Sequence, residues 1–338
     1  MNSEDNETIK TLFQHQHGYV ISKVMFTASE LGIFDLLLES EEPLTAPTIA
    51  EHLGTSLGGM ERLLGACVSL KLLKMERKDN TGLYENTNLA NLCLAKASPK
   101  SQYNYMKLYS EAFYPLFQDL PDVVRKGQRL CKPSKTVYES LYRSEENQQI
   151  FNSAMDEVWR LHGRDVISAF DFSRFPVIYD LGGGNGALAK ECISLYPNST
   201  ITIFDLPEVV EKAKKHFVCS EDRIIFQEGN FFKDPVPEAD LYILSRVLCD
   251  WDDEKCVQLL TKLHKTCKPG GGVLLVQMVL DEDRCGPLQV HLLSIIMLLL
   301  TDGKERTLSE CSALFSKSGF KDVEFKKGSR YDVVFGRK

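Results

Sequence analysis

The chain has 338 residues, of which 43% are hydrophobic and 26% are charged, so it is long enough for two domains or one large domain with a packed core. Its formal net charge of −7 disfavours a polyanionic partner, because nucleic-acid binding usually requires a basic face. The ten cysteines include no Cys-x-x-Cys pair, and the sequence starts without a secretory signal. We therefore expect a reduced, cytoplasmic protein without a zinc site.

The first hundred residues have the pattern of a helical module that ends in a hairpin. Apolar residues recur at helical spacing over residues 21–38, and residues 45–54 carry the start and stop signals of a short helix. A second apolar helix is expected over residues 60–74, and the sequence NTG at 80–82 predicts a hairpin turn between two short strands. This order is typical of a winged helix, which we assign to residues 1–105.

A winged helix suggests DNA binding, but the charge of this module argues against it. Residues 1–100 hold nine Lys or Arg and thirteen Asp or Glu, a balance of −4. The expected recognition helix opens with Gly-Gly-Met-Glu and has few side chains that could reach base edges. We therefore expect a dimerising module and no nucleic-acid partner.

The rest of the chain, residues 106–338, has an α/β pattern. Residues 106–174 are mostly helical, and we interpret them as a connector and a lid over the cofactor and substrate site. Over residues 175–338, apolar strands alternate with helices, which indicates a Rossmann-like, mostly parallel sheet with crossover helices. The final residues predict two strands joined by a turn at 327–329, which would add an antiparallel strand to this sheet.

One apolar run, LLSIIMLLL at residues 292–300, raises the question of a membrane segment. Nine residues are too few, because a spanning helix needs about 20. We expect a helix that is buried in a core or in a subunit interface, and no membrane association.

The strongest functional signal is VIYDLGGGNGALAKE at residues 177–191. It predicts a strand that ends at Asp180, a glycine-rich turn, and a helix that begins near Ala187. Glycines let a ligand approach the backbone closely, and the start of a helix offers unpaired N–H groups. A second strand is expected to end at Asp205, where a carboxylate can accept both hydroxyls of a ribose.

Two classes of nucleotide cofactor fit this pattern, and a purely structural glycine turn is a third possibility. A dinucleotide site usually has the form Gly-x-Gly-x-x-Gly; here Ala189 takes the place of the third glycine, which such sites tolerate. The form Asp-x-Gly-Gly-Gly-x-Gly, starting at Asp180, favours S-adenosylmethionine, because the acidic residue helps to hold the charge at the amino-acid end of that cofactor. The third strand end, FQEGNFF at 226–232, and the antiparallel C-terminal pair also favour it.

At this point the sequence resembles the small-molecule O-methyltransferases of plants and animals, and the resemblance extends over nearly the whole chain. It implies a homodimer, S-adenosylmethionine as cofactor, no metal, and a small aromatic substrate such as a hydroxyindole. The segments that carry it are VSLKLLK (68–74), DLGGGNGALAKECISLYP (180–197), IFDLPEVV (203–210), FQEGNFFKDP (226–235), RVLCDW (246–251), CKPGGG (267–272), LDEDRCGPL (280–288) and ERT (305–307).

The resemblance also implies which residues hold the cofactor. Asn230 departs from the family, which has Asp there, but its amide oxygen can still accept a hydrogen bond from the adenine amino group, so we expect weaker binding and not its loss. The implied contacts are Tyr142, Trp159, Asp180, Gly182, Gly184, Gly186, Asp205, Gly229, Asn230, Phe231 and Arg246.

The catalytic positions depart from the family more strongly. Loss of the hydroxyl proton during methyl transfer is assisted by a base, which contributes roughly 10²–10⁴ to the rate. The family has a histidine where this chain has Cys249, a thiol whose pKa is about 8.5 before Asp250 raises it further. Of two carboxylates that orient the family's histidine, Glu305 is present and the other is replaced by Gln277. An asparagine that holds substrate corresponds to Ile296.

Two functions from different classes are compatible with these departures. One is an O-methyltransferase that acts on a hydroxyindole or a similar aromatic hydroxyl with altered or impaired chemistry. The other is a non-catalytic dimer that still binds S-adenosylmethionine and has a structural or regulatory role. His291 is a candidate replacement base, although a histidine on a helix surface or in an interface is its ordinary interpretation. The identity of residue 249 is what separates the two functions.

Overall fold

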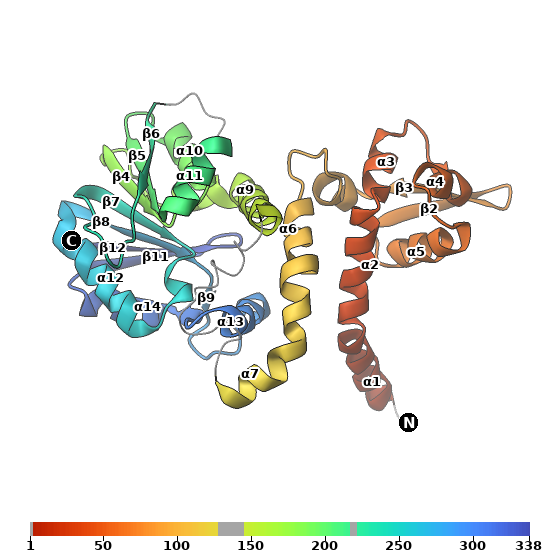
Figure 1. The fold of residues 1–338 in the computed structure, drawn as a ribbon. Coiled ribbons are helices and arrows are strands. Elements are labelled where there is room, and N and C mark those ends of the chain that lie inside the picture. The colour runs from red at the N-terminus through yellow and green to blue at the C-terminus, as the bar shows by residue number, and fades with distance from the viewer. Residues whose placement is uncertain (1–2, 128–144, 217–221) are drawn as a thin grey trace. The chain divides into compact units, whose positions relative to one another are not determined.

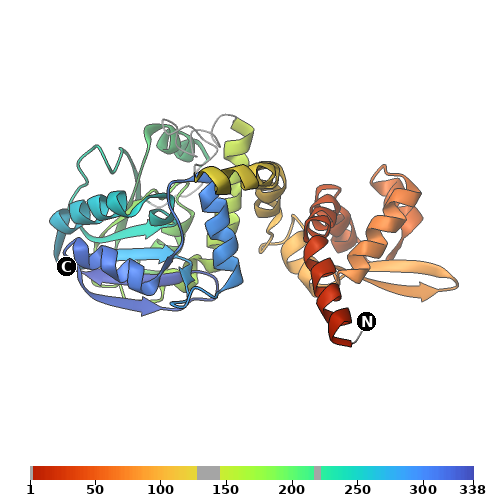
Figure 2. The same ribbon diagram turned by 90° about the horizontal axis from the view of Figure 1, so that it is seen from below.

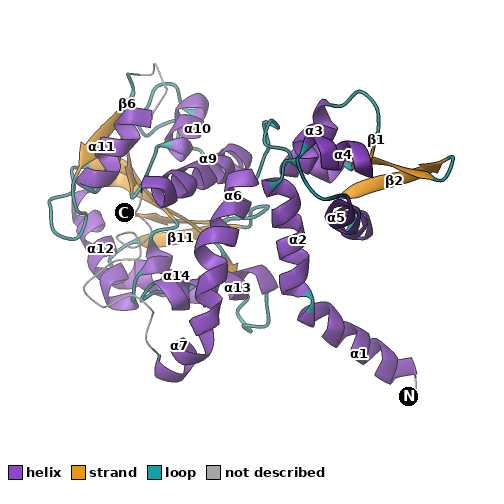
Figure 3. Ribbon diagram, turned by 45° about the vertical axis from the view of Figure 1, so that its right-hand side comes forward, coloured by secondary structure: helices purple, strands orange, loops and turns teal. Residues whose placement is uncertain are grey.

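The computed structural model describes residues 3–127, 145–216 and 222–338, and the chain divides into two compact units, Met1–Tyr114 and Pro115–Lys338 (Figure 1). The first unit is mostly helical and has a small antiparallel sheet of order β1-β3-β2 (Figure 3). Its elements are α1 (Ser3–Gln16), α2 (Gly18–Glu30), α3 (Ile33–Glu39), β1 (Leu44–Thr45), α4 (Ala46–His52), α5 (Leu57–Ser69), β2 (Leu73–Lys78), β3 (Thr81–Asn86), η1 (Ala90–Leu94), α6 (Tyr103–Leu108) and η2 (Tyr109–Phe113).

The winged-helix pattern predicted for the first unit is present, with three local corrections. The apolar stretch 21–38 is not one helix, because the chain breaks between α2 and α3 at residues 31–32. The next long helix, α5, ends at Ser69, and the apolar residues after it enter β2. The hairpin turn is Asp79-Asn80 and not residues 80–82; both residues have positive φ, of 51° and 64°, as a two-residue hairpin turn requires.

The second unit is built on a seven-stranded sheet of order β11-β12-β8-β7-β4-β5-β6, in which β8, β7, β4, β5 and β6 are parallel and β12 is antiparallel to both of its neighbours. Its elements are η3 (Tyr114–Asp119, which starts at the boundary), α7 (Leu120–Lys126), α9 (Glu145–Ile167), β4 (Val177–Leu181), α10 (Ala187–Leu195), β5 (Thr200–Asp205), α11 (Pro207–His216), β6 (Ile224–Glu228), β7 (Ala239–Ser245), η4 (Leu248–Asp250), α12 (Asp253–Thr266), β8 (Cys267–Gln277), β9 (Val279–Leu280), α13 (Leu288–Leu300), β10 (Arg306–Thr307), α14 (Leu308–Lys317), β11 (Lys321–Lys326) and β12 (Asp332–Arg337).

Helices cover both faces of this sheet, as the alternating strands and helices predicted (Figures 1 and 2). Helices α9, α10 and α11 pack together with β5 and β6, whereas α12 and α14 pack on the other face. Alternate residues of β7 therefore enter different layers, and Tyr242 and Leu244 join the core formed with α12 and α14. The chain leaves β4 in one direction through β5 and β6 and returns on the other side through β7 and β8, so β4 is the switch point at which ligands bind in such sheets.

The apolar run predicted to be a buried helix lies in α13. Four residues of α13 are buried, among them Ile296 and Leu299, whereas Leu288 and Leu292 of the same helix remain 66% and 55% exposed. Within the described ranges, the structure contains no helix with the length and apolar character that crossing a membrane requires.

The contact between β8 and β12 leaves no room for a side chain at Gly272. A Cβ atom there would lie 2.5 Å from the carbonyl oxygen of Gly336 and 2.6 Å from the ring of Phe335. We expect Gly272→Ala to lower the free energy of unfolding by about 1–3 kcal/mol, because the two strands must separate to admit the methyl group.

Urea denaturation monitored by circular dichroism measures this change. Gly65→Ala, in the exposed middle of α5 with no atom near the new methyl group, is the matched control. That substitution should stabilise its unit by roughly 0.5–1 kcal/mol through helix propensity. Equal stability of Gly272→Ala and the wild type would contradict the packing argument.

Candidate functional site

A pocket lies at the carboxyl ends of the parallel strands β4, β5, β6 and β7, where the sheet topology places a ligand. Each strand contributes the residues at or just after its end, and one face of α9 forms a further wall. The lining residues are Phe151, Asn152, Met155, Trp159, Gly182, Gly183, Gly184, Asn185, Asp205, Leu206, Val209, Gly229, Asn230, Phe231, Phe232, Ser245, Arg246, Val247, Asp250 and Trp251.

The glycine-rich turn after β4 forms the centre of the pocket. Gly182 and Gly184 have φ values of 72° and 56°, which an L side chain rarely adopts, so the turn depends on glycine at both positions. Asn185 ties the turn to α9, because its amide donates hydrogen bonds to the carbonyl oxygen of Asn152 and to Asp156. Gly186 precedes α10, as predicted, and β4 itself continues one residue beyond Asp180.

Two carboxyl groups from different strands support this turn, one partly buried and one fully buried. Asp205, the last residue of β5, accepts hydrogen bonds from the backbone N–H groups of Gly184 and Leu206 at 2.9 and 2.7 Å. Burial raises the pKa of Asp205 to about 6, although these two hydrogen bonds oppose the shift. Asp180, only 1% exposed, lies beneath Gly183, and its burial together with the nearby Asp205 raises its pKa to about 7.

The loop after β6 contains Gly229, Asn230 and Phe231, all of which line the pocket. The side-chain oxygen of Asn230 accepts hydrogen bonds from the N–H groups of Phe232 and Lys233, at 3.0 and 3.2 Å. Both lone pairs of that oxygen are therefore occupied, and the amide has only its NH₂ group to offer a ligand. The expectation that the oxygen of Asn230 accepts a hydrogen bond from the adenine amino group does not hold in this arrangement.

Helix α9 contributes Trp159, which is buried and packs in a tilted arrangement against Tyr331, from the segment before β12, with ring centres 5.1 Å apart. Residues 151, 152, 155 and 159 of this helix line the pocket because they lie about one turn apart on one face. Tyr142, the other aromatic residue that the resemblance implied, lies outside the described residues.

Arg246, just after β7, contributes a positive charge to the pocket wall. Its guanidinium donates two hydrogen bonds to the carboxylate of Glu305, at 2.6 and 3.1 Å, and Glu305 is 1% exposed. Glu305 is thereby fully engaged with an arginine, in a geometry that favours strong pairing. It was expected to orient a base at position 249, and it is instead committed to the arginine that follows β7.

The other expected catalytic residues do not line the described pocket. Cys249 is 1% exposed; its thiol lies 3.8 Å from a carboxylate oxygen of Asp250, and burial raises its pKa well above the ordinary value. Gln277 is also buried, and its amide donates to the sulfur of Cys311. Ile296 is 4% exposed within α13. None of these three positions lines the pocket, and Cys249 and Gln277 each have a polar partner of their own.

Sequence reasoning missed several residues of the pocket wall, among them Ser245, Asp250 and Trp251. Ser245 directly precedes Arg246, and Asp250 and Trp251 directly follow Cys249 within the segment RVLCDW, so including the neighbours of each singled-out residue along this segment would have found them. The two tryptophans of the chain, Trp159 and Trp251, both line the pocket, so intrinsic fluorescence reports on it directly.

The pocket residues fit a nucleoside ligand with a cationic amino-acid end. Within the described part of the chain, Asp180 Oδ1 and Ser245 Oγ are buried without a hydrogen-bond partner. Because buried polar atoms are normally paired, a ligand at this site could supply hydrogen bonds to both. Asp205 supplies a carboxylate at the end of β5, where a ribose would lie. Among the described residues, no group of three or more His, Cys, Asp or Glu side chains is arranged to hold a metal ion.

Comparison with known proteins gives a consistent result along the chain. Residues 13–96 match the model of the O-methyltransferase dimerisation domain, and residues 117–321 match that of the O-methyltransferase domain. The chain is 52% identical to acetylserotonin O-methyltransferase of Gallus gallus over 99% of both sequences, and 47% identical to that of Homo sapiens over the full length of both. The crystal structure of human N-acetylserotonin methyltransferase in complex with SAM superposes with a TM-score of 0.94, at 47% identity, over 100% of this chain and 99% of that one.

The buried carboxyl of Asp180 should make the stability of the unliganded protein depend on pH. Its pKa is raised in the folded state, so the folded protein holds the proton more tightly than the unfolded chain does. The resulting stability is complete below pH 4 and is lost as the pH rises towards 7. We expect Asp180→Asn to reduce the change in unfolding free energy between pH 5 and pH 8 by roughly 2 kcal/mol.

Urea titrations at the two pH values measure this difference. Asp171→Asn is the control, because hydrogen bonding by the backbone and side chain of Ser173 lowers the pKa of that exposed carboxyl and moves its titration below this range. An unaltered pH dependence in Asp180→Asn would show that Asp180 does not titrate in the folded protein as the structure predicts.

Proposed function

The chain belongs to the O-methyltransferase family, and we propose that it binds S-adenosylmethionine in the pocket at the strand ends and methylates N-acetylserotonin or a similar hydroxyindole slowly, without a side-chain base. The cofactor and the substrate are those of the acetylserotonin O-methyltransferases, to which it is 47–52% identical over its full length. We infer the slow rate from the position of Cys249, which is buried and does not line the pocket.

The residues of the pocket have distinct tasks in this proposal. Asp205 accepts the ribose hydroxyls, and the turn from Gly182 to Gly184 admits the amino-acid end against the backbone. Arg246, held by Glu305, offers its remaining N–H donors to a carboxylate. The bound cofactor supplies a sulfonium methyl group that is open to attack by an oxygen nucleophile. Helix α9 and Trp251 cover the site and limit the access of water.

Proton removal is the step for which the chain lacks an obvious group. The hydroxyl of a phenol has a pKa of about 10, so about one molecule in a thousand is ionised at pH 7. The thiol of Cys249 cannot act as a base because burial keeps it protonated. Orientation alone still accelerates a displacement. Turnover should therefore depend on the small fraction of substrate that is already ionised.

A second function follows from the same observations. Glu305 is bound to Arg246, Gln277 to Cys311, and Cys249 is buried, so the three family positions that handle the proton are all engaged elsewhere. A cofactor-binding dimer without catalysis would keep the pocket residues and tolerate these changes. Measured turnover separates this function from the first.

We also propose a homodimer formed through the first unit and located in the cytoplasm. The match of residues 13–96 to the dimerisation domain supports the assembly. Five exposed apolar side chains on α1 and α2 give this unit a surface suited to a partner: Leu12, Phe13, Tyr19, Val20 and Ile21. The eight described cysteines are free thiols, which suits a reducing compartment.

Cofactor binding can be tested without turnover. We expect S-adenosylhomocysteine to change the fluorescence of Trp159 and Trp251, and Asp205→Asn to weaken its binding about tenfold or more, because the amide replaces one acceptor with a donor. For the wild type, binding should also weaken several-fold as the pH falls through 6, where Asp205 becomes protonated.

Glu208→Gln is the matched control, because it removes a nearby exposed carboxylate that does not line the pocket. Its affinity should equal that of the wild type. If the wild type did not bind S-adenosylhomocysteine, the proposal would be refuted, because it requires cofactor binding in this pocket.

Methyl transfer from labelled S-adenosylmethionine to N-acetylserotonin tests the missing base. For the wild type, we expect slow turnover that rises about tenfold per pH unit between pH 7 and 9, as the substrate ionises. In the double variant Cys249→His with Gln277→Glu, turnover at pH 7.5 should rise by roughly 10²-fold and the pH profile should flatten, because a base is restored.

Cys285→His, which places the same imidazole at an exposed loop thiol, is the control and should behave as the wild type. Fast wild-type turnover with a flat profile would point to a replacement base. No turnover at any pH, with intact cofactor binding, would favour the non-catalytic dimer.

A further inference from the structure

The turn that follows β7 determines the shape of one pocket wall. It runs from Arg246 to Trp251 and includes the short helix η4. Asp250 and Trp251 line the pocket, whereas Cys249, which directly precedes them, is buried and does not line it. Trp251 is packed edge-on against Phe232, with ring centres 4.8 Å apart. Any shift of this turn therefore moves pocket residues (Arg246, Val247, Asp250 and Trp251 all line the pocket) and the position of the family's catalytic base.

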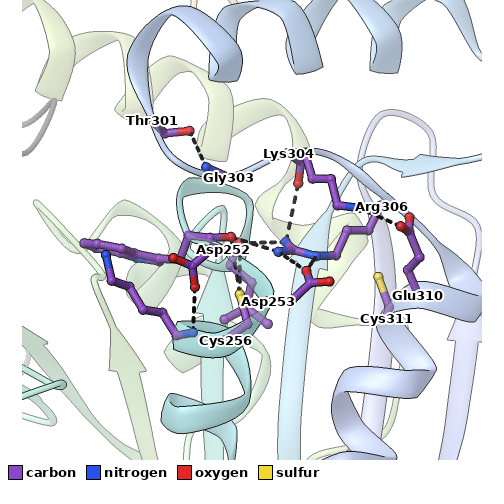
Figure 4. Close-up of polar contacts among 12 residues, drawn as sticks. Asp252, Asp253, Cys256, Thr301, Gly303, Lys304, Arg306, Glu310 and Cys311 are labelled. Carbon is purple, nitrogen blue, oxygen red and sulfur yellow. Dashed lines mark hydrogen bonds and ion pairs between the residues drawn. The ribbon is translucent and has the colours of Figure 1, made fainter. Parts of the chain in front are cut away.

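Arg306 holds the middle and the end of this turn. Its side chain is 1% exposed, and its guanidinium donates 2.8 Å hydrogen bonds to the carbonyl oxygens of Leu248 and Trp251 (Figure 4). It also donates to Asp253 at 2.8 and 3.0 Å and to the carbonyl oxygen of Lys304 at 3.4 Å. The planar fork fixes these groups in one relative geometry, which a lysine with a single nitrogen cannot reproduce.

The residues before Arg306 contact the same turn. A Cβ atom at Gly303 would lie 2.1 Å from the carbonyl oxygen of Cys249 and 2.5 Å from the amide nitrogen of Trp251, so the backbones touch. Glu305 binds Arg246, at the start of the turn. Residues 303–306, which we call the brace, therefore hold the turn at its start, its middle and its end.

The brace is itself anchored away from the pocket. Arg306 and Thr307 form β10, which pairs with β9. Thr307 and Glu310 form a capping box that starts α14, and Lys304 pairs with Glu310 at 2.7 Å (Figure 4). The brace is thus a fixed support, and the turn after β7 is the part that it positions.

We propose that Arg306 is a positioning residue for ligand binding: its guanidinium, through the carbonyl oxygens of Leu248 and Trp251, sets the place of Asp250 and Trp251 in the pocket wall. The proposal rests on the proposed cofactor pocket. The alternative is that Arg306 contributes only to the stability of the core, in which case its loss would lower the melting temperature and leave the affinity of the folded protein unchanged.

The decisive measurement is the affinity for S-adenosylhomocysteine of Arg306→Lys, well below its melting temperature, by tryptophan fluorescence and calorimetry. We expect about tenfold weaker binding or more, since small displacements of positioning groups have large effects. Arg284→Lys, an exposed arginine paired with Glu310, is the matched control and should bind as the wild type does. Gly272→Ala, destabilised at a distant strand contact, controls for lost stability and should also keep its affinity.

A second readout locates the change. In a Trp159→Phe background Trp251 is the sole emitter, and Arg306→Lys should shift its emission to longer wavelength without ligand, because the turn relaxes towards solvent. Should Arg306→Lys fail to fold, Gly303→Ala displaces the same turn while keeping the guanidinium, and the same two changes are expected from it.

Wild-type affinity in either variant, with Trp251 emission unchanged, would overturn the positioning role. Absence of binding by the wild type would instead refute the cofactor pocket, so the two failures are distinguishable.

Discussion

The ion pair between Arg246 and Glu305 is the interaction on which the rest of the site depends. The Glu305 side chain is fully buried and that of Arg246 is 17% exposed, so the carboxylate depends on the guanidinium for its charge partner. Breaking a buried pair typically costs about 3–5 kcal/mol, because the remaining charge stays buried. The pair joins the end of β7 to the segment before β10, and Arg246 accepts a φ of 57° to reach it. The turn after β7 therefore starts from a fixed point, and Arg306 fixes its end. The pocket wall can be rigid although it consists of a loop.

The same ion pair satisfies the carboxylate of Glu305 independently of the residue at position 249. In this chain, Glu305 needs no histidine to satisfy its carboxylate, because Arg246 occupies both oxygens. The cysteine at 249 fills a buried position beside Arg246, Asp250 and Glu305, where burial keeps its thiol neutral. In the proposed function, cofactor binding uses the strand ends and the glycine turn, whereas proton transfer would use the side chain at 249. Cofactor binding and proton transfer would therefore use different residues, so one could be lost without the other.

Much of the architecture was predictable because each of its parts has a local cause. The alternation of strands and helices predicted the parallel sheet, and the glycine turn with Asp205 predicted the edge at which the pocket lies. The partners of buried polar groups were not predictable, because they come from segments distant in sequence. Glu305 was expected to orient a base, and only the folded chain shows that it faces Arg246. The oxygen of Asn230 is likewise taken by its own loop, a contact that depends on backbone geometry and not on residue type.

Burial of carboxyl groups gives the pocket a further property. Asp180 and Asp205 lie on adjacent strands, and both have pKa values raised by burial, so without a ligand the site holds more protons near neutral pH than two exposed carboxyls would. A cationic ligand at the glycine turn would favour the ionised carboxylates and release those protons. Ligand charge would then offset the desolvation of the carboxylates, which a neutral ligand of the same shape cannot do. On this reasoning, the buried acidic pair selects for the charge at the amino-acid end of the ligand, and the glycine turn selects for its shape.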